Sequence, residues 1–519
     1  MTFSPYSMNA AQGWAGDLTV SGGESTENDQ VNAADPLFFA MASHWDAIRA
    51  VTEGTDYLRQ NCDRFLPQQP MELADSWHGR VNRSTFSNYF GKVLRTAVGL
   101  ILRKQVRLEC ESDADQEWWD DWAEDPCRDG STDLDQFCTN LLESALSFGH
   151  SAVMVDYATG EGIRTLADEQ EAELKPYLVE VKAPQIIGWR HSPTENRGRL
   201  QQVRIRESAR VPVGKFGVEY RNRVRVLEPG NYSLYESTDE RGDAGWQLIE
   251  SGKVSVEQVP LCVVYGDKRQ VLFSKPPLLS LAHQNLHHFR VASDLTQSLH
   301  IAAQPLLIGK GLDDLPNDNT SKGAVGLSVN NMLLIAPEAS VEYVVPQVGA
   351  FDSHQVELER IVSEMKSLSI ALLSSEKNGV EAAKAKALDR IDSNSVLSVV
   401  SKSLQTCIQD AVNLAAEYSG REAPEVVIIR DFNLERMEGT DISAIQGLFT
   451  NGLIPQEVAL RLLQEGEVLD DDMDLEEIMS QSENEELATM EQELDKTDKM
   501  MDITDKHTPD EPAKPPING

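Results

Sequence analysis

The chain has 519 residues, a formal net charge of −37 and a sequence pI of about 4.6. This acidity disfavours a classical DNA-binding or membrane-surface protein, because such proteins carry basic patches and a high pI. No stretch approaches the roughly 18 consecutive apolar residues that a membrane span needs. The first 18 residues lack a basic region followed by an apolar run, so we expect no signal peptide. The length predicts several folding units.

The N-terminal third is predicted to be mainly helical. Residues 1–35 are rich in Gly, Ser, Asn and Asp, which is typical of a flexible arm. Helical spacing of apolar residues begins near Pro36, in LFFAMASHWDAIRAV. A clearer amphipathic helix covers residues 132–148 and ends at Gly149. The acidic helical context of Trp118, Trp119 and Trp122 favours a packing surface over a ligand-binding site.

The middle of the chain changes to strand patterns. SAVMVDY, residues 151–157, is predicted to be a buried strand, and short alternating runs over 176–265 predict a meander of antiparallel strands. A long helix is then expected from Pro277 to about Ala303. Two strands flanking the polar tip LPNDNTSKG follow at about 305–346.

The C-terminal part is predicted to return to helix. One helix is expected at about 352–374, and its apolar face comprises Leu358, Ile361, Val362, Met365, Leu368 and Leu372. After a break at SSEKNG, residues 374–379, a second helix is expected to reach Tyr418, and its apolar face comprises Leu388, Ile391, Val399, Leu404, Ile408, Ala411, Leu414 and Tyr418. A strand, PEVVIIRDF, and two short helices after Thr440 and Pro455 come next. Residues 465–495 then hold 14 acidic residues and no Lys or Arg.

No catalytic or metal-binding pattern stands out from this sequence. His283 and His287 have the spacing of HExxH, but Gln284 replaces the glutamate, so we interpret them as polar residues of a helix surface. The acidic run after Asp470 lacks the glycine and the final glutamate of a calcium loop. The six cysteines form no CxxC, which favours incidental thiols in a reducing compartment. We therefore predict no enzyme activity and no cofactor.

The order of these parts resembles one known family. Its most telling pieces are SKPPLLSLAHQNLHHFRVASDLTQSLHIAAQPLLIGKG, GLSVNNMLLIAPEASVEYVVPQ, the break at LLSSEKNG, and ISAIQGLFTNGLIPQEVALRLLQEGEVLDDDMDLEE. Together they resemble the portal proteins of tailed bacteriophages, particularly a subgroup defined by a domain of unknown function. The resemblance covers most of residues 36–480. These are patterns of layout rather than of catalytic residues.

The resemblance implies an α+β portal subunit with an α/β wing, a helical stem, a small β-containing clip, a tunnel loop with a long helix, and an α-helical crown. The implied boundaries are, in chain order, a flexible arm at 1–35, the wing at 36–275, a stem helix at 276–303, the clip at 304–350, a stem helix at 351–369, the tunnel loop and long helix at 370–420, a wing strand at 421–436, the crown at 437–485 and a polar tail at 486–519.

The resemblance also implies a function and partners. Such proteins form a ring, usually of twelve subunits, at one vertex of the capsid, made in the host cytoplasm and retained in the virion. The ring passes double-stranded DNA without sequence preference during packaging and ejection, and no membrane is involved. Its partners are further copies of itself, the major capsid protein, the large subunit of terminase and the head-to-tail adaptor proteins.

Two groups of residues are the candidate functional residues under this reading. The DNA-channel candidates, on or just after the tunnel loop, are Lys377, Lys384, Lys386 and Arg390. The partner-facing candidates in the clip are Lys310, Asn317, Asn319 and Lys322. For both groups, ordinary solvated polar residues remain an equal alternative. For the whole chain, the alternatives are another head-completion or adaptor protein of the virion, or an enzyme with an unrecognised site.

Overall fold

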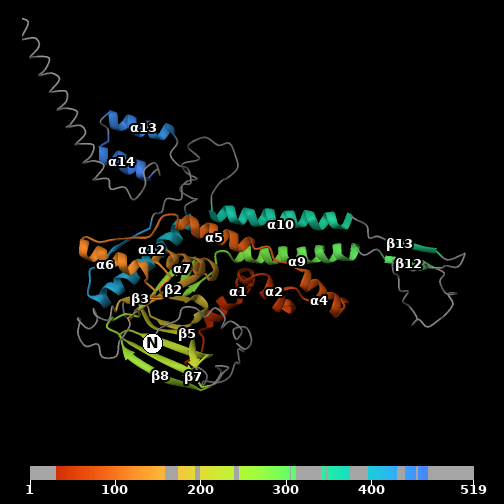
Figure 1. Ribbon diagram of the computed structural model, residues 1–519, viewed down its shortest axis with the longest axis horizontal. Coiled ribbons are helices and arrows are strands. Elements are labelled where there is room, and N and C mark those ends of the chain that lie inside the picture. The colour runs from red at the N-terminus through yellow and green to blue at the C-terminus, as the bar shows by residue number, and fades with distance from the viewer. Residues whose placement is uncertain are drawn as a thin grey trace, which may run out of the picture. The chain divides into compact units, whose positions relative to one another are not determined.

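The computed structural model describes residues 31–157, 174–192, 199–238, 245–303, 306–310, 340–344, 349–373, 395–428, 439–451 and 454–465. The chain divides into two compact units, residues 1–430 and 431–519, which we describe separately. Helices and antiparallel strands both contribute to the larger unit, which confirms the mixed α+β class (Figure 1). Within the part of the chain that the structure describes, no helix is long and apolar enough to cross a membrane.

The larger unit begins with a group of helices. Their bounds are α1 (Pro36–Glu53), α2 (Thr55–Gln60), α3 (Cys62–Phe65), α4 (Ala74–Arg83) and α5 (Tyr89–Ile101). The start of α1 at Pro36 confirms the prediction and has a local cause. Asp35 caps the helix by accepting a hydrogen bond from the Leu37 N–H at 2.8 Å, and proline suits the first helical position because it has no N–H to satisfy.

The tryptophan-rich helix α6 (Asp113–Glu124) packs as the sequence predicts. Trp119 and Trp122 are fully buried, with their rings edge to face at 5.2 Å. Each indole N–H finds a backbone acceptor far away in the sequence, the carbonyl of Glu422 at 3.0 Å for Trp119 and that of Pro176 at 2.8 Å for Trp122. The cluster therefore joins distant segments of the unit, as a packing surface does.

The predicted buried strand is the centre of a three-stranded antiparallel sheet. That strand is β2 (His150–Tyr157), which follows α7 (Leu134–Phe148), and its neighbours are β3 (Pro176–Lys182) and β9 (Leu261–Tyr265). Helices α7 and α12 (Ser395–Ser419) both contact β2, and its first six residues are all buried, so side chains on both faces of the strand are covered. Because both faces are covered, the sequence of the strand is a continuous apolar run and does not alternate between apolar and polar residues.

The meander predicted over 176–265 is only partly correct. Five strands, β4 to β8, do form an antiparallel sheet in chain order, with bounds Ile186–His191, Leu200–Val213, Gly217–Glu228, Asn231–Ser237 and Trp246–Lys253. The first and last runs of the region, however, are β3 and β9, which pair with β2 in the other sheet. Alternation within a strand does not reveal which partner it will pair with, and here β2 lies outside the repeating region.

A shared apolar core joins the two sheets. The 3₁₀ turn Ala183–Gln185 leads directly from β3 into β4, and buried side chains of both sheets belong to one cluster. The buried members of this core are Ala152, Met154, Val181, Ile186, Val203, Ile205, Leu227, Val259, Leu261 and Leu272. Two short strands, β10 (Lys268–Gln270) and β11 (Phe273–Ser274), follow β9.

The last segment of the larger unit returns to its start. Helix α12 is followed by β14 (Glu425–Val427), which pairs antiparallel with β1 (Arg107–Glu109). The predicted apolar face of α12 holds for Leu404, Ile408, Ala411 and Leu414, which are all buried. It is wrong for Val399, which is 63% exposed because it lies on the side of the helix that packs on nothing within the described residues. Leu388 and Ile391 lie outside the described residues.

In the smaller unit, both predicted short helices are present. They are α13 (Gly439–Thr450) and α14 (Gln456–Glu465), and they pack against each other.

We expect Gly149→Ala to destabilise the larger unit by about 3 kcal/mol. Gly149 has φ +99°, and an added Cβ would lie 2.5 Å from the Ser274 Oγ and 3.0 Å from the backbone carbon of Lys275. Gly130→Ala is the matched control, because Gly130 also has a positive φ (+74°) but has no atom within 4 Å of an added Cβ. Urea unfolding of both variants measures the difference. If both variants lose the same free energy of unfolding, the close contact of the added Cβ with Ser274 has no effect on stability.

Candidate functional site

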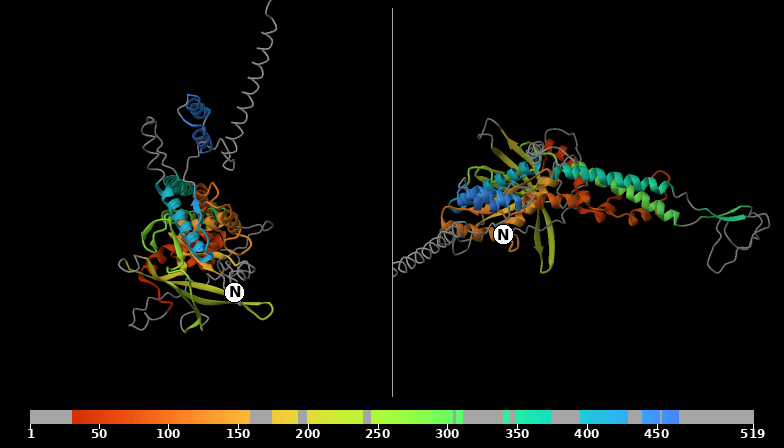
Figure 2. Two further views of the ribbon diagram at one scale, coloured as in Figure 1. Left: turned by 90° about the vertical axis from the view of Figure 1, so that its left-hand side faces the viewer. Right: turned by 90° about the horizontal axis from the view of Figure 1, so that it is seen from above.

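Two long helices and two short strands follow one another along the chain, and together we call them the helical hairpin. It consists of α9 (Leu279–Ala302), β12 (Leu306–Lys310), β13 (Ser340–Val344) and α10 (Gly349–Leu373). Figures 1 and 2 show α9 and α10 side by side, with the strand pair beyond their far end. The strands pair antiparallel from Leu306 opposite Val344 to Lys310 opposite Ser340. The helix–strand–strand–helix order confirms the sequence prediction for this region.

A buried asparagine fixes the base of α9 against the first turn of α5. Asn285 is fully buried. Its Oδ1 accepts a hydrogen bond from the Phe90 N–H at 3.0 Å, and its Nδ2 donates to the Ser87 carbonyl at 2.9 Å. The Phe90 N–H is one of the helix-terminal donors of α5 that no helix carbonyl can satisfy, so Asn285 acts as a cap supplied from another helix.

Further along, polar contacts attach α9 to α4 and the segment before it. The Ser84 hydroxyl donates to that of Ser293 at 2.7 Å. The Gln69 amide donates to Asp294 at 3.0 Å, and the Arg290 guanidinium donates to the Phe65 carbonyl at 3.0 Å. Because each contact needs one specific pair of positions, together they fix the position of α9 along its axis, which apolar packing alone would leave free to slide.

A buried ion pair anchors the segment before α4. Arg80 is 3% exposed and makes a two-pronged contact to Glu72, at 2.9 Å from Nε to Oε1 and 2.8 Å from Nη2 to Oε2. The Gln69 N–H also donates to Glu72, at 2.9 Å, and Arg80 donates to the Pro67 carbonyl at 3.0 Å. The hydrogen bonds from Arg80 are the main reason that the pKa of Glu72 lies below its usual range.

Helix α10 packs on α9 through a narrower face than the sequence predicts. Ile361 and Met365 are buried, whereas Leu358 and Val362 are half-buried and Leu368 is 38% exposed. Part of the predicted apolar face of α10 therefore stays exposed. The sequence period identifies the apolar positions of a helix, but it does not say how many of them a neighbouring helix covers. The side chain of Leu372 lies outside the described residues.

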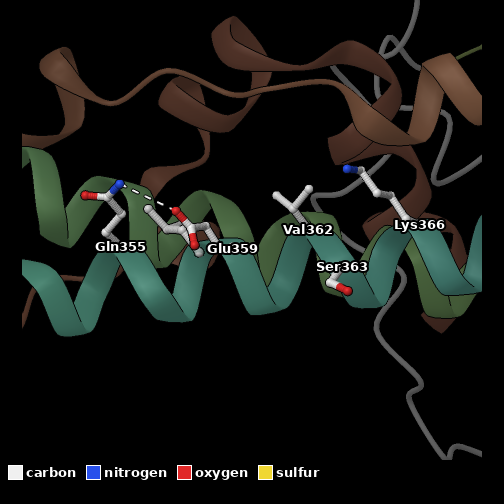
Figure 3. A pocket seen from close by; sticks show the side chains of 6 residues that line it. Gln355, Glu359, Val362, Ser363 and Lys366 are labelled. Atoms are coloured by element: carbon white, nitrogen blue, oxygen red, sulfur yellow. Dashed lines mark hydrogen bonds between the residues drawn. The ribbon is translucent and has the colours of Figure 1, made fainter.

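The exposed part of that stripe forms a shallow groove along α10 (Figure 3). Its lining residues all belong to this one helix and are Gln355, Leu358, Glu359, Val362, Ser363 and Lys366. Figure 3 shows Gln355, Glu359, Val362 and Lys366 projecting from the same side of the helix, one turn apart. A surface of this kind suits a packed protein side chain better than a small molecule, which needs a concave site that encloses it.

The histidines of α9 do not converge on a metal site. His283 and His287 are exposed, and His287 lies 3.7 Å from Glu357 of α10. His288 is buried instead, with its ring edge to face with Tyr89 at 5.3 Å, and burial lowers its pKa. Across the described ranges, no group of three or more His, Cys, Asp or Glu side chains could hold a metal ion.

Most of the candidate residues from the sequence fall outside what the structure describes. Lys310 lies at the end of β12, opposite Ser340. The residues outside the described ranges are Asn317, Asn319, Lys322, Lys377, Lys384, Lys386 and Arg390. The structure therefore neither gathers these residues into a site nor separates them.

Sequence reasoning overlooked the segment between α3 and α4. There Met71 is 99% exposed and Leu73 is 77% exposed, on either side of the anchored Glu72. The segment QQPMEL has no apolar period, so no pattern drew attention to it. The local signal was limited to two nearby prolines, Pro67 and Pro70, and an isolated apolar pair.

Residues 277–419 match a family described as "Domain of unknown function (DUF4055)". This range contains the helical hairpin and α12. No curated protein matches the sequence. Among solved structures, the chain is similar to one described as "Neck of empty GTA particle computed with C6 symmetry", with 11% sequence identity and a TM-score of 0.38. That similarity covers 76% of this chain and 95% of the other.

We expect Arg80→Met to destabilise the larger unit by about 3–5 kcal/mol, because it leaves the Glu72 carboxylate buried without its partner. Arg360→Met is the matched control. Arg360 pairs with Glu357 and Glu364 on the exposed side of α10, where water screens the charges, so its loss should cost much less stability than the loss of Arg80. Urea unfolding at neutral pH measures both, and similar losses would contradict the anchoring role of the Arg80–Glu72 pair.

The pH dependence of stability provides a second measurement on the same pair. The pKa of Glu72 is lower in the folded chain than in the unfolded chain. The ionised carboxylate therefore contributes its full share to the free energy of unfolding above the unfolded-state pKa of about 4.3. That share is lost as the pH falls through the folded-state pKa. The stability difference between the natural chain and Glu72→Gln should therefore shrink below about pH 4.

Proposed function

We propose that this chain is the portal subunit of a tailed bacteriophage and forms a ring at one vertex of the capsid. The observation that carries the proposal is the helical hairpin, in which two long helices carry a small strand pair away from an α+β body. This is the arrangement that the sequence resemblance leads one to expect of a stem and a clip. The chain would act as a structural component of the virion, without catalysis or a cofactor.

The subdomains follow from the same proposal. We assign the wing to about 36–275, completed by the strand at 421–436, the stem helices to 276–303 and 351–369, the clip to 304–350, the tunnel loop and long helix to 370–420, and the crown to 437–485. The pairing of β14 with β1 supports placing the late strand in the wing, because it joins Glu425–Val427 to Arg107–Glu109.

DNA would be handled in this ring as a sliding cargo. Each copy has a net charge of −37, which repels duplex DNA over roughly 8–10 Å at physiological salt and so opposes tight binding. The few cations of the proposed tunnel loop, Lys377, Lys384, Lys386 and Arg390, would touch phosphates weakly and without reading the sequence. Lys310, Asn317, Asn319 and Lys322 would face terminase and later the head-to-tail adaptors.

We expect the purified full chain to form closed rings. Native mass spectrometry should give particles whose mass is a whole multiple of 57.6 kDa, and negative-stain images should show a central hole. A particle of 57.6 kDa that stays monomeric at all concentrations would contradict the proposal, and turnover of a substrate by that monomer would favour an enzyme instead.

Replacing Lys377, Lys384 and Lys386 together by Ala should change the length of DNA that is packaged, because three weak phosphate contacts per subunit would be lost around the ring. Replacing Lys92, Lys215 and Lys253 by Ala, which removes the same charge from the proposed wing, is the control. Packaged genome length, measured by gel electrophoresis of DNA from purified particles, is the readout. Unchanged packaging in the first variant would exclude these lysines from the channel.

A further inference from the structure

Two apolar side chains on the segment between α3 and α4 are held out into solvent. They are Met71, 99% exposed, and Leu73, 77% exposed, and we call them the apolar knob. Large apolar side chains scattered singly on a surface need no explanation, but these two lie two residues apart on a short segment. What distinguishes them is how the segment that carries them is built.

The knob is anchored from within. Glu72, between its two members, points inward to the buried guanidinium of Arg80 and also accepts a hydrogen bond from the Gln69 N–H. Its carbonyl accepts a further hydrogen bond from the Gln68 amide at 2.6 Å. With Glu72 fixed inward, its two neighbours are directed outward. Met71 adopts φ +67°, a left-handed conformation that costs a side-chain-bearing residue free energy.

The groove on α10 is apolar, like the knob, and carries a charge opposite to one beside the knob. Its floor is apolar, from Leu358 and Val362. At one end Lys366 is exposed and makes no ion pair within the described residues, whereas Arg360 on the same helix pairs with Glu357 and Glu364. Beside the knob, the exposed Asp75 likewise makes no ion pair there.

We propose that the apolar knob of one copy inserts into the α10 groove of a second copy, with Asp75 of the first beside Lys366 of the second. The knob lies on α4 and the segment before it, the groove lies on α10, and both helices pack on α9. A contact between two different surfaces of the same chain is heterologous, and it closes into a ring when the rotation allows. This inference rests on the proposed ring and locates one of its subunit contacts.

A disulfide test measures the contact directly. Met71→Cys combined with Val362→Cys should give bands of two and more chains on non-reducing gels after mild oxidation of the assembled full chain, because a disulfide forms only when the two Cα atoms come within about 7 Å. Met71→Cys combined with Val399→Cys is the control, since Val399 is 63% exposed on α12 and lies outside the groove. Each single variant controls for the six natural cysteines.

Removing the knob tests its contribution to assembly. The double variant Met71→Gly and Leu73→Ser should raise the concentration needed for half-assembly at least about tenfold, measured by mass photometry. Glycine relieves the positive φ at position 71, so the monomer should keep its thermal stability. Leu248→Ser is the control, because Leu248 is 49% exposed on β8, away from both surfaces. Asp75→Lys and Lys366→Asp should each weaken assembly, and their combination should restore it.

The outcomes separate this inference from the proposed function. Cross-linked multimers in the 71–362 pair alone, with weakened assembly of the knob variant, would support the contact. Rings that form normally in the knob variant, without cross-links in the 71–362 pair, would overturn the contact and leave the ring intact. A disulfide within a single chain would also overturn it. A natural chain that stays monomeric would overturn the proposed function, and this inference with it.

Discussion

Helix α9 depends on buried polar contacts that set its position against its neighbours. Asn285 caps α5 at the base, and Ser293 and Asp294 contact Ser84 and Gln69 further along. Apolar side chains supply most of the burial, but a long amphipathic helix can shift by a turn and still bury a similar stripe. Hydrogen bonds that need one exact partner remove that freedom, since a shifted helix would leave buried donors unsatisfied. The direction in which the hairpin leaves the body follows from these contacts.

The Arg80–Glu72 pair extends the same constraint to the surface. A buried ion pair contributes little net stability by comparison with apolar residues of similar size, because desolvation offsets its attraction. Its effect here is conformational. It fixes a short segment without regular structure against α4 and α9, and so determines which side chains of that segment stay exposed. Copies of so acidic a chain repel each other, so the proposed ring would require short-range apolar and oppositely charged contacts of this kind.

Charge has two separate consequences for the proposed ring. The net charge of −37 opposes both tight DNA binding and self-association, but over distances limited by salt. Short-range apolar contacts act below that distance and are not screened. A portal built in this way would hold its subunits together by local packing while its acidic surface keeps DNA from adhering.

The sequence predicted the elements well and their partners less well. The start of α1 at Pro36, after Asp35, and the end of α7 before Gly149 could both be predicted. Capping and backbone conformation act within a few residues, so the local sequence is enough to place such boundaries. The order of helix, two strands and helix in the hairpin could also be predicted. The exposure of Val399 and Leu368 could not be predicted. A period of 3.6 residues identifies the apolar stripe of a helix, but it does not identify the neighbouring element that covers the stripe.

By itself, the sequence determined the class of the fold, the long helices and the acidic character that argues against tight nucleic-acid binding. Only the tertiary structure decided that β3 and β9 pair with β2, that Asn285 caps a helix almost two hundred residues earlier, and that Met71 and Leu73 stand out beside an anchored Glu72. The physical reason is the distance along the chain over which each effect acts. Propensity, capping and periodicity act between near neighbours in the chain, whereas pairing, burial and exposure depend on which distant segments come into contact.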